Sequence, residues 1–201
     1  GGGKVATQMA TDLAIPQQMI GGRRVTDAET LKIVTMVYAG LINKNIVAAL
    51  QSHQCNAMGM TGADANLILS HKRVHESIDY GYVGDVDQVN AAFLHTILQQ
   101  NITVVVAPIT HDGNGQLLNT NADTCAQVIA EGLSAYYDVS LIYSFEKNGV
   151  LLDVNDDESV IPVIDTHSYE QLKADQIIFE GMLPKLNGAF NAIHNGVKNV
   201  I

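Results

Sequence analysis

The chain has 201 residues, of which 47% are apolar and 16% charged, which suits one α/β domain with a buried core and argues against disorder. Its 21 acidic and 11 basic residues give a formal charge of −10, which argues against a nucleic-acid partner because such proteins carry a basic surface. No uninterrupted apolar run reaches about 18 residues and no signal-peptide pattern is present, so we expect a soluble cytoplasmic protein with no membrane partner.

The first quarter of the chain predicts helices. A glycine run opens it as a turn, and the apolar spacing of residues 4–15 is typical of a helix. Thr26 and Glu29 fit the S/T-x-x-E capping box, which predicts that a second helix begins there. The pattern that follows is long enough for two consecutive helices, with a break near Gly40 or Asn43.

The middle of the chain alternates strands and helices. Short or exposed strands are expected at 56–60 and 79–86, and Asp87 is expected to cap the helix that follows the second of them. The run ITVVVAPI, residues 102–109, is β-branched and continuous, which predicts a buried strand. A loop and then a helix over 123–135 follow it.

The last third continues the alternation. Residues 138–145 predict a second buried strand, and Ser168 with Gln171 indicates another capped helix. A loop leads into a helix that Gly196 ends, and a strand begins in VKNVI. Such alternation implies a mostly parallel sheet covered by helices on both faces, with ligands bound beyond the carboxyl ends of the strands.

Four short motifs carry candidate chemistry. The glycine run before a helix favours an anion site, although it could equally be an ordinary turn. In GGRRVTD, Arg23 or Arg24 could bind a carboxylate through two parallel hydrogen bonds, against the alternative of two solvated arginines. In GMLPK, Lys185 could neutralise a transferring phosphoryl group or could be a surface lysine.

The fourth motif, NTNAD, places Asn119, Asn121 and Asp123 after a strand. Asn donates and accepts, which suits a substrate with amide and carboxylate groups, and Asp123 could orient lysines. A simple helix cap would explain one of the three polar residues. The seven histidines show no metal-ligand spacing, so no protein metal site is expected, and neither a nucleophile-elbow nor a Walker motif is present.

The order of GGG, GRRVTD, GMTGADAN, GYVGDV, VVVAPI, NTNAD and GMLPK along essentially the whole chain resembles the amino acid kinase family. Within it, the motifs are similar to those of the kinases that act on N-acylglutamates. The resemblance implies a three-layer αβα sandwich with a mainly parallel central sheet. It also implies transfer of the γ-phosphoryl group of ATP to the side-chain carboxylate of N-acetyl-L-glutamate, a step of arginine biosynthesis, with Mg²⁺ held by the phosphates.

Roles in the site follow from the same resemblance, position by position. Main-chain N–H groups of Gly2 and Gly3 would bind the acylglutamate and the phosphoryl group. Arg24 and Asn119 would bind the substrate carboxylate and amide, with Asn121 supporting that loop. Lys185 would stabilise the transition state, and Asp123 would hold the catalytic lysines. The nucleotide would contact Glu146, Lys147, Asn148, Gly149, Val150, Leu151, Ile177, Ile178 and Phe179.

The chain departs from the family pattern in three places. The family has a second catalytic lysine on a strand before the glycine run. We therefore expect residues 1–201 to be a single amino acid kinase domain that lacks this N-terminal strand and helix segment. The C-terminal end of the domain is expected to be missing as well. Phe145 and Glu146 stand where a Thr-Asp or Ser-Asp pair is common. GADAN replaces a glycine-aspartate-glycine run near the acyl group, so N-succinylglutamate is an alternative substrate.

Other functions within the fold are those of carbamate kinase, aspartokinase and uridylate kinase, which the ordered pair GRRVTD and NTNAD argues against. A non-catalytic sensor of acylglutamate or nucleotide is the alternative from another class, and the missing lysine strand is the feature that favours it. Partners are therefore expected to be small molecules, and the family implies a homo-oligomer, usually a homodimer and sometimes a hexamer.

Overall fold

The structure is a computed structural model that describes residues 2–20, 23–178 and 182–201. Its helices are α1 (Gly2–Asp12), α2 (Ala28–Thr35), the π-helical η1 (Met36–Ile42), α3 (Asn43–Ser52), the 3₁₀ turn η2 (Asp64–Asn66), α4 (Ala91–Leu98), α5 (Ala122–Leu133), α6 (Thr166–Ala174) and α7 (Leu183–His194). Its strands are β1 (Gln18–Ile20), β2 (Arg23–Val25), β3 (Ala57–Thr61), β4 (Ile68–Lys72), β5 (Gly84–Val89), β6 (Thr103–Ala107), β7 (Ile109–His111), β8 (Leu117–Asn119), β9 (Ser140–Leu141) and β10 (Asn199–Val200).

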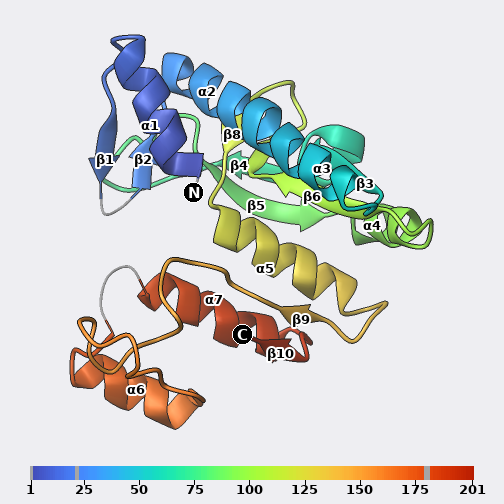
Figure 1. The fold of residues 1–201 in the computed structure, drawn as a ribbon. Coiled ribbons are helices and arrows are strands. Elements are labelled where there is room, and N and C mark those ends of the chain that lie inside the picture. The colour runs from blue at the N-terminus through green and yellow to red at the C-terminus, as the bar shows by residue number, and fades with distance from the viewer. Residues whose placement is uncertain (1, 21–22, 179–181) are drawn as a thin grey trace.

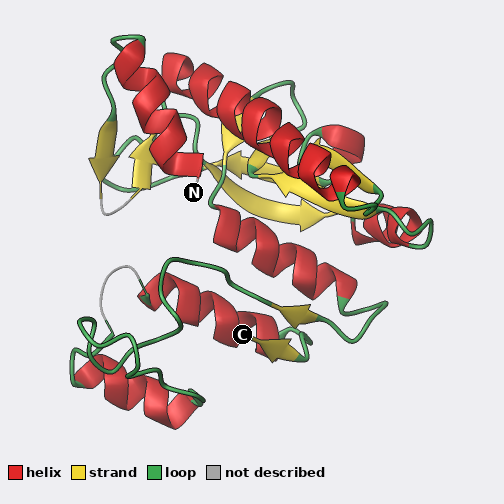
Figure 2. Ribbon diagram, in the orientation of Figure 1, coloured by secondary structure: helices red, strands yellow, loops and turns green. Residues whose placement is uncertain are grey.

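Helices cover both faces of the strands β3 to β8 (Figure 1). On one face, buried residues of α1, α2 and η1 pack against Ile109 of β7. On the other, Leu94 of α4 and Cys125 of α5 pack against Met60 and Ile68 of β3 and β4. Figure 2 shows the strands β3 to β8 between these two groups of helices. Two apolar clusters on opposite faces of one strand layer define an αβα sandwich, which confirms the predicted fold class.

Strand pairing is parallel along the chain's crossovers and antiparallel in its hairpins. β3 pairs with β6, β4 with β7 and β9 with β10 in parallel. The pairs β1–β2, β4–β5 and β7–β8 are antiparallel. In the described ranges the strands form a four-stranded sheet, in the order β5-β4-β7-β8, and three two-stranded sheets. The strands β4 and β8, which the sequence reading missed, account for two of the antiparallel pairs.

The second helix begins one residue later than the capping box predicts. Asp27 is its N-cap, and the Asp27 carboxylate accepts a hydrogen bond from the main-chain N–H of Thr30 at 2.7 Å. Thr26 is instead fully buried, and its hydroxyl donates to the main-chain oxygen of Arg24. No break follows near Gly40, because the helix widens into η1 and continues as α3. The predicted cap and break were therefore wrong.

Two other predicted caps are held by neighbouring residues. Asn90, not Asp87, caps α4. Asp87 lies in β5 and is 2.6 Å from Nδ1 of His71 across the strand pair. Asp165 caps α6 and completes a capping box with Ser168 as the third helical residue, so Ser168 is the second member of that box and not the first. In each case a short acidic or amide side chain competes for the same main-chain donors.

The continuous helical run Ala28–Ser52 has the length, 25 residues, and the apolar composition of a membrane-crossing helix. Core helices of globular proteins share both properties. Here Leu31, Ile33, Val34 and Val37 of this run are buried against α1 and the sheet. The run therefore contributes to the core.

Candidate active site

A pocket of about 370 Å³ opens where the first turn of α1, the β1–β2 hairpin, η1, the end of β6 and the β8–α5 junction meet. It is lined by five residues that the sequence reading singled out for substrate binding, Gly2, Gly3, Arg24, Asn119 and Asn121. These residues are up to about 120 positions apart in the chain. The tertiary structure therefore brings the whole predicted acylglutamate group to one place.

Gly2 and Gly3 form the first turn of α1, not a turn before it. The first four N–H groups of a helix lack partners in the helix, so the pocket meets unpaired donors and the positive end of a helix dipole. A Cβ at Gly2 would lie 2.9 Å from Cδ1 of Ile42 and 3.1 Å from the ring of Tyr38. Glycine there allows η1 to pack close to the helix start, and Gly1 lies outside the described residues.

Arg24 is fixed against α1. Its guanidinium donates to the main-chain oxygen of Gly3 at 3.1 Å and to Oγ1 of Thr7 at 2.9 Å, and it also donates to Oε1 of Gln17. Three neutral acceptors hold the group without removing its charge. A guanidinium so placed presents a fixed cation to a carboxylate in the pocket.

All three arginines of the chain line this pocket, namely Arg23, Arg24 and Arg73. Arg73 follows β4, and its Nε lies 3.0 and 3.1 Å from the two carboxylate oxygens of Asp85. The side chain of Arg73 is mostly buried, and its guanidinium lies over the ring of Tyr80. The sequence reading missed Arg73. The scarcity of arginine in a chain of charge −10 was the available signal.

Asn119 and Asn121 have different partners. Nδ2 of Asn119 donates to the hydroxyl of buried Thr26 at 3.0 Å, and its main-chain N–H donates to Tyr82. Asn121 is the N-cap of α5, since its Oδ1 accepts from the main-chain N–H of Thr124 at 3.0 Å. The simple cap foreseen as an alternative is therefore present at Asn121, which also faces the pocket.

Lys185 and Asp123 form an ion pair between two helix starts. Nζ of Lys185, in the first turn of α7, lies 2.5 Å from Oδ2 of Asp123, in the first turn of α5. Both side chains are partly shielded from solvent. Neither residue lines the arginine-bearing pocket, but Asp123 directly follows Asn121 and Ala122, which do. The pair therefore flanks the pocket.

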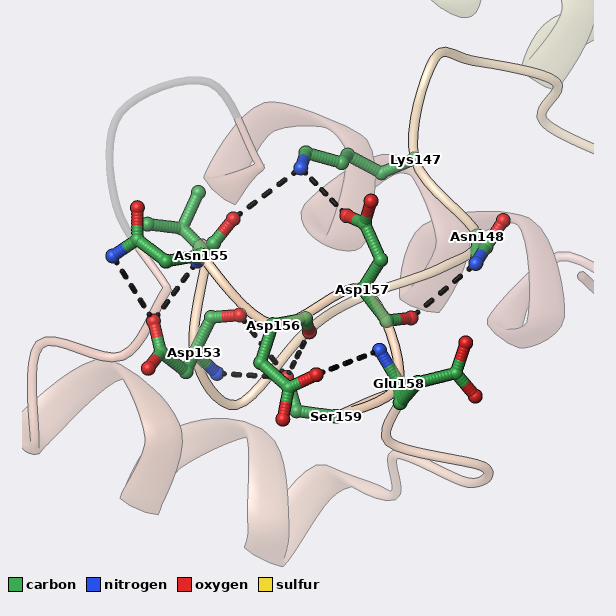
Figure 3. A network of polar contacts seen from close by, with 9 residues as sticks. Lys147, Asn148, Asp153, Asn155, Asp156, Asp157, Glu158 and Ser159 are labelled. Atoms are coloured by element: carbon green, nitrogen blue, oxygen red, sulfur yellow. Dashed lines mark hydrogen bonds and ion pairs between the residues drawn. The ribbon is translucent and has the colours of Figure 1, made fainter.

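The first residues of the segment predicted to hold the nucleotide, 146–148, are exposed, and their side chains form ion pairs or hydrogen bonds with other parts of the protein. Glu146 accepts from Nζ of Lys4 at 2.6 Å. Lys147 reaches Asp157 at 2.7 Å and the main-chain oxygen of Val154 at 3.3 Å, and Asn148 donates to the main-chain oxygen of Asp157 (Figure 3). The acidic residues Asp156, Asp157 and Glu158 remain exposed, and Asp157 joins their loop to this segment.

Residues 149–151 of the predicted nucleotide segment lie at an isolated β-bridge to residues 160 and 161. Leu151 forms an isolated antiparallel bridge with Val160, and Val150 accepts from the main-chain N–H of Ile161. A Cβ at Gly149 would lie 2.9 Å from Val160.

Ile178 is buried with Tyr169 and Leu172, so its side chain serves a small core around α6. Ile177 packs partly buried against that core. Phe179 lies outside the described residues.

Comparison with known proteins gives consistent matches. A model of the amino acid kinase family matches residues 1–201. The acetylglutamate kinase of Cytophaga hutchinsonii is 59% identical over 202 residues, which cover 100% of this chain and 76% of that protein. The acetylglutamate kinase of Phocaeicola vulgatus is 56% identical over 201 residues, 100% of this chain and 78% of that protein. The crystal structure of smu.665 from Streptococcus mutans superposes with a TM-score of 0.82 at 24% identity, covering 98% of this chain and 76% of that chain.

Proposed function

The chain belongs to the amino acid kinase family, and from that premise we propose that it transfers the γ-phosphoryl group of ATP to the side-chain carboxylate of N-acetyl-L-glutamate in arginine biosynthesis. The observation that carries this function is the identity of 54–59% with several acetylglutamate kinases over the full chain. Small molecules are therefore its substrates, and the product is an acyl phosphate.

The reaction brings an anionic acceptor to an anionic donor, so it needs positive charge and alignment more than a base. Arg24 and Asn119 bind the α-carboxylate and amide of the acylglutamate, with Asn121 supporting that loop. The N–H groups at Gly2 and Gly3 meet the reacting carboxylate and the transferring group. Lys185 stabilises the charge of the transition state, and Asp123 holds its ammonium. Their convergence on and beside one pocket supports these roles.

ATP lies along Glu146–Leu151 and beside Ile177, Ile178 and Phe179 in this proposal. In the ranges that the structure describes, no three His, Cys, Asp or Glu side chains gather to hold a metal ion. Asp123, the acid nearest the predicted chemistry, is already paired with Lys185. In this proposal Mg²⁺ is held by the phosphate oxygens, as the family resemblance implies, where it would offset their negative charge.

N-succinylglutamate is the second candidate acceptor. The observation that favours it is the third guanidinium in the pocket, because a succinyl group adds one carboxylate to the two of the glutamate. Asp85 already pairs with Arg73, and that pairing favours the uncharged acetyl group. The acetyl substrate therefore remains the first choice.

Residues 1–201 act as one domain of a cytoplasmic homodimer in this proposal. Met36 and Leu41 of the helical run Ala28–Ser52 are exposed, with 45–54% of each residue accessible. Exposed apolar side chains on this run suit a contact with a second copy. Light scattering on the purified protein gives the mass of the assembly.

The test is a coupled ADP-release assay on the full-length protein with N-acetylglutamate and N-succinylglutamate in parallel. We expect turnover that requires ATP, Mg²⁺ and the acylglutamate, with a higher kcat/KM for the acetyl compound. Turnover of carbamate, aspartate or UMP instead would overturn the proposed substrate. Binding of acylglutamate without any ADP release would identify a sensor.

A further inference from the structure

Two aromatic rings lie beside the ammonium group of Lys185. Its Nζ is 5.5 Å from the centre of the Tyr143 ring and 5.9 Å from the centre of the Phe145 ring. Both distances are within reach of a cation–π attraction. We propose that Tyr143 and Phe145 are positioning residues that hold Lys185 in place for phosphoryl transfer, an inference that rests on the catalytic role proposed for Lys185.

Tyr143 is itself held at several points. Its main-chain N–H donates to the main-chain oxygen of Ile201 at 2.8 Å, which extends the β9–β10 pair. Its ring packs against the cluster of Ala130, Leu141 and Ala192. Its hydroxyl approaches the main-chain oxygen of Asp123 at 3.5 Å. The ring therefore links the start of α5 to the strand that leads into the nucleotide segment.

The Tyr143 ring stays neutral at ordinary pH. Burial, and then the negative charges of Asp123 and Glu131, raise the pKa of its hydroxyl above the usual tyrosine value. The face of a neutral phenol attracts a cation without carrying a net charge of its own.

Gly188 lies close to the same group of side chains. A Cβ at Gly188 would lie 2.8 Å from Oε1 of Gln127 and 3.5 Å from the hydroxyl of Tyr143. A larger residue would therefore displace Gln127, whose amide donates to Glu131, or crowd the Tyr143 hydroxyl beside Lys185.

The rings do what a carboxylate alone cannot. Asp123 attracts the ammonium but offsets its charge, and that charge is what a transferring phosphoryl group needs. Aromatic faces restrain the flexible lysine chain and displace water from it while leaving its net charge intact. The two rings and the Asp123 carboxylate thus fix the position of Nζ, and only the carboxylate offsets part of its positive charge.

Phe145 is the residue of this arrangement that departs from the common family pattern. It stands where the family pattern commonly has Thr or Ser in the nucleotide loop, and it is about one-third exposed. Its ring is one of the two beside Lys185. A Thr or Ser side chain at this position would offer no aromatic face to the ammonium group.

The first experiment measures steady-state kinetics of Tyr143→Leu and Phe145→Leu in the full-length enzyme. We expect each to lower kcat by about tenfold, with the KM values for acylglutamate and ATP changed far less. Tyr143→Phe keeps the ring and should recover most of the kcat that leucine loses. Tyr136→Leu, at an exposed tyrosine stacked on His95, is the matched control and should leave kcat unchanged.

The second experiment asks whether Tyr143 acts through Lys185. In a Lys185→Ala background, Tyr143→Leu should cause no further fall in kcat, because the group that it positions is gone. The inference would be overturned if Tyr143→Leu lowered kcat by a further tenfold in that background, or if Tyr143→Phe and Tyr143→Leu lowered the kcat of the otherwise unchanged enzyme equally. If Lys185→Ala alone left kcat intact, the proposed role of Lys185 would fail instead, so the two failures are distinguishable.

Discussion

The two sides of the site are built differently. On the acylglutamate side, Arg24 is held by three hydrogen bonds and Asn119 rests on the fully buried Thr26. On the nucleotide side, Glu146 and Lys147 are held by exposed ion pairs to Lys4 and Asp157, respectively. The bonds of Arg24 to Gln17 and of Asn119 to Thr26 are partly buried, and such hydrogen bonds cost more to break than exposed ion pairs, which contribute little and weaken with salt.

This difference indicates which side is arranged before substrate arrives. Fixed neutral acceptors around Arg24 preorganise a cation for a small carboxylate, which raises affinity because little ordering remains. The nucleotide segment presents side chains whose present partners a polyphosphate can replace. The Lys185–Asp123 pair lies between the two extremes, since both side chains are partly shielded.

The largest effect is expected from Lys185→Ala. Loss of a cation that acts mainly in the transition state should lower kcat by ~10²–10³ with little change in the KM for acylglutamate. Steady-state assays check this, with Lys198→Ala as the control, because Lys198 pairs with an exposed Asp138. Equal changes in kcat and KM, or none, would exclude the role.

The next largest effect is expected from Arg24→Leu. Removal of a carboxylate-binding guanidinium should raise the KM for acylglutamate by roughly 10- to 100-fold and leave the KM for ATP nearly unchanged. Lys32→Ala removes an exposed cation of α2 and should alter neither constant. A rise in the KM for ATP would show that the two sides are not separate, and would break the comparison.

Smaller effects, on the free energy of unfolding, are expected from removing the N-cap of one helix on each side. Asp27→Ala should lower the free energy of unfolding by about 1 kcal/mol at pH 7. The main-chain N–H of Thr30 lowers the pKa of Asp27, so this stability is present at neutral pH and is lost as the pH falls through the folded-state pKa.

Asp165 of α6 is the matched residue, because Ser168 likewise lowers its pKa at a helix start. Urea titrations at pH 7 and pH 3 measure both variants. We expect a smaller loss for Asp165→Ala, since that cap is fully exposed. A larger loss at Asp165 would show that the nucleotide side is the more firmly built.

The smallest effect is expected from Asp157→Asn. Its ion pair with Lys147 is exposed, so the free energy of unfolding should change by less than about 1 kcal/mol. Release of Lys147 from its partner should leave the KM for ATP unchanged or lower it. Thermal denaturation in low and high salt, with ATP kinetics, would show a contrary result as a large loss of stability or a raised KM.

Much of the fold was predictable because its signals are local. Apolar spacing predicted α1, and a continuous β-branched run predicted β6, since both patterns depend only on neighbouring residues. The strands β4 and β8 were missed because ILSHK and LLN show neither an apolar alternation nor the continuous β-branched run that predicted β6. Caps were misplaced by a few residues, because several short polar side chains compete for the same free N–H groups.

The sequence by itself determined the family, the kind of chemistry and most residues of the predicted site, because motif order and residue type are readable without coordinates. Only the tertiary structure decided which side chains meet. It placed Arg73 in the same pocket as Arg24. It also brought Lys185 against Asp123 across 62 positions, with Tyr143 and Phe145 beside the ammonium. The reason is physical, since such contacts depend on the packing of α5 against α7 and of β4 against β5, which no local pattern encodes.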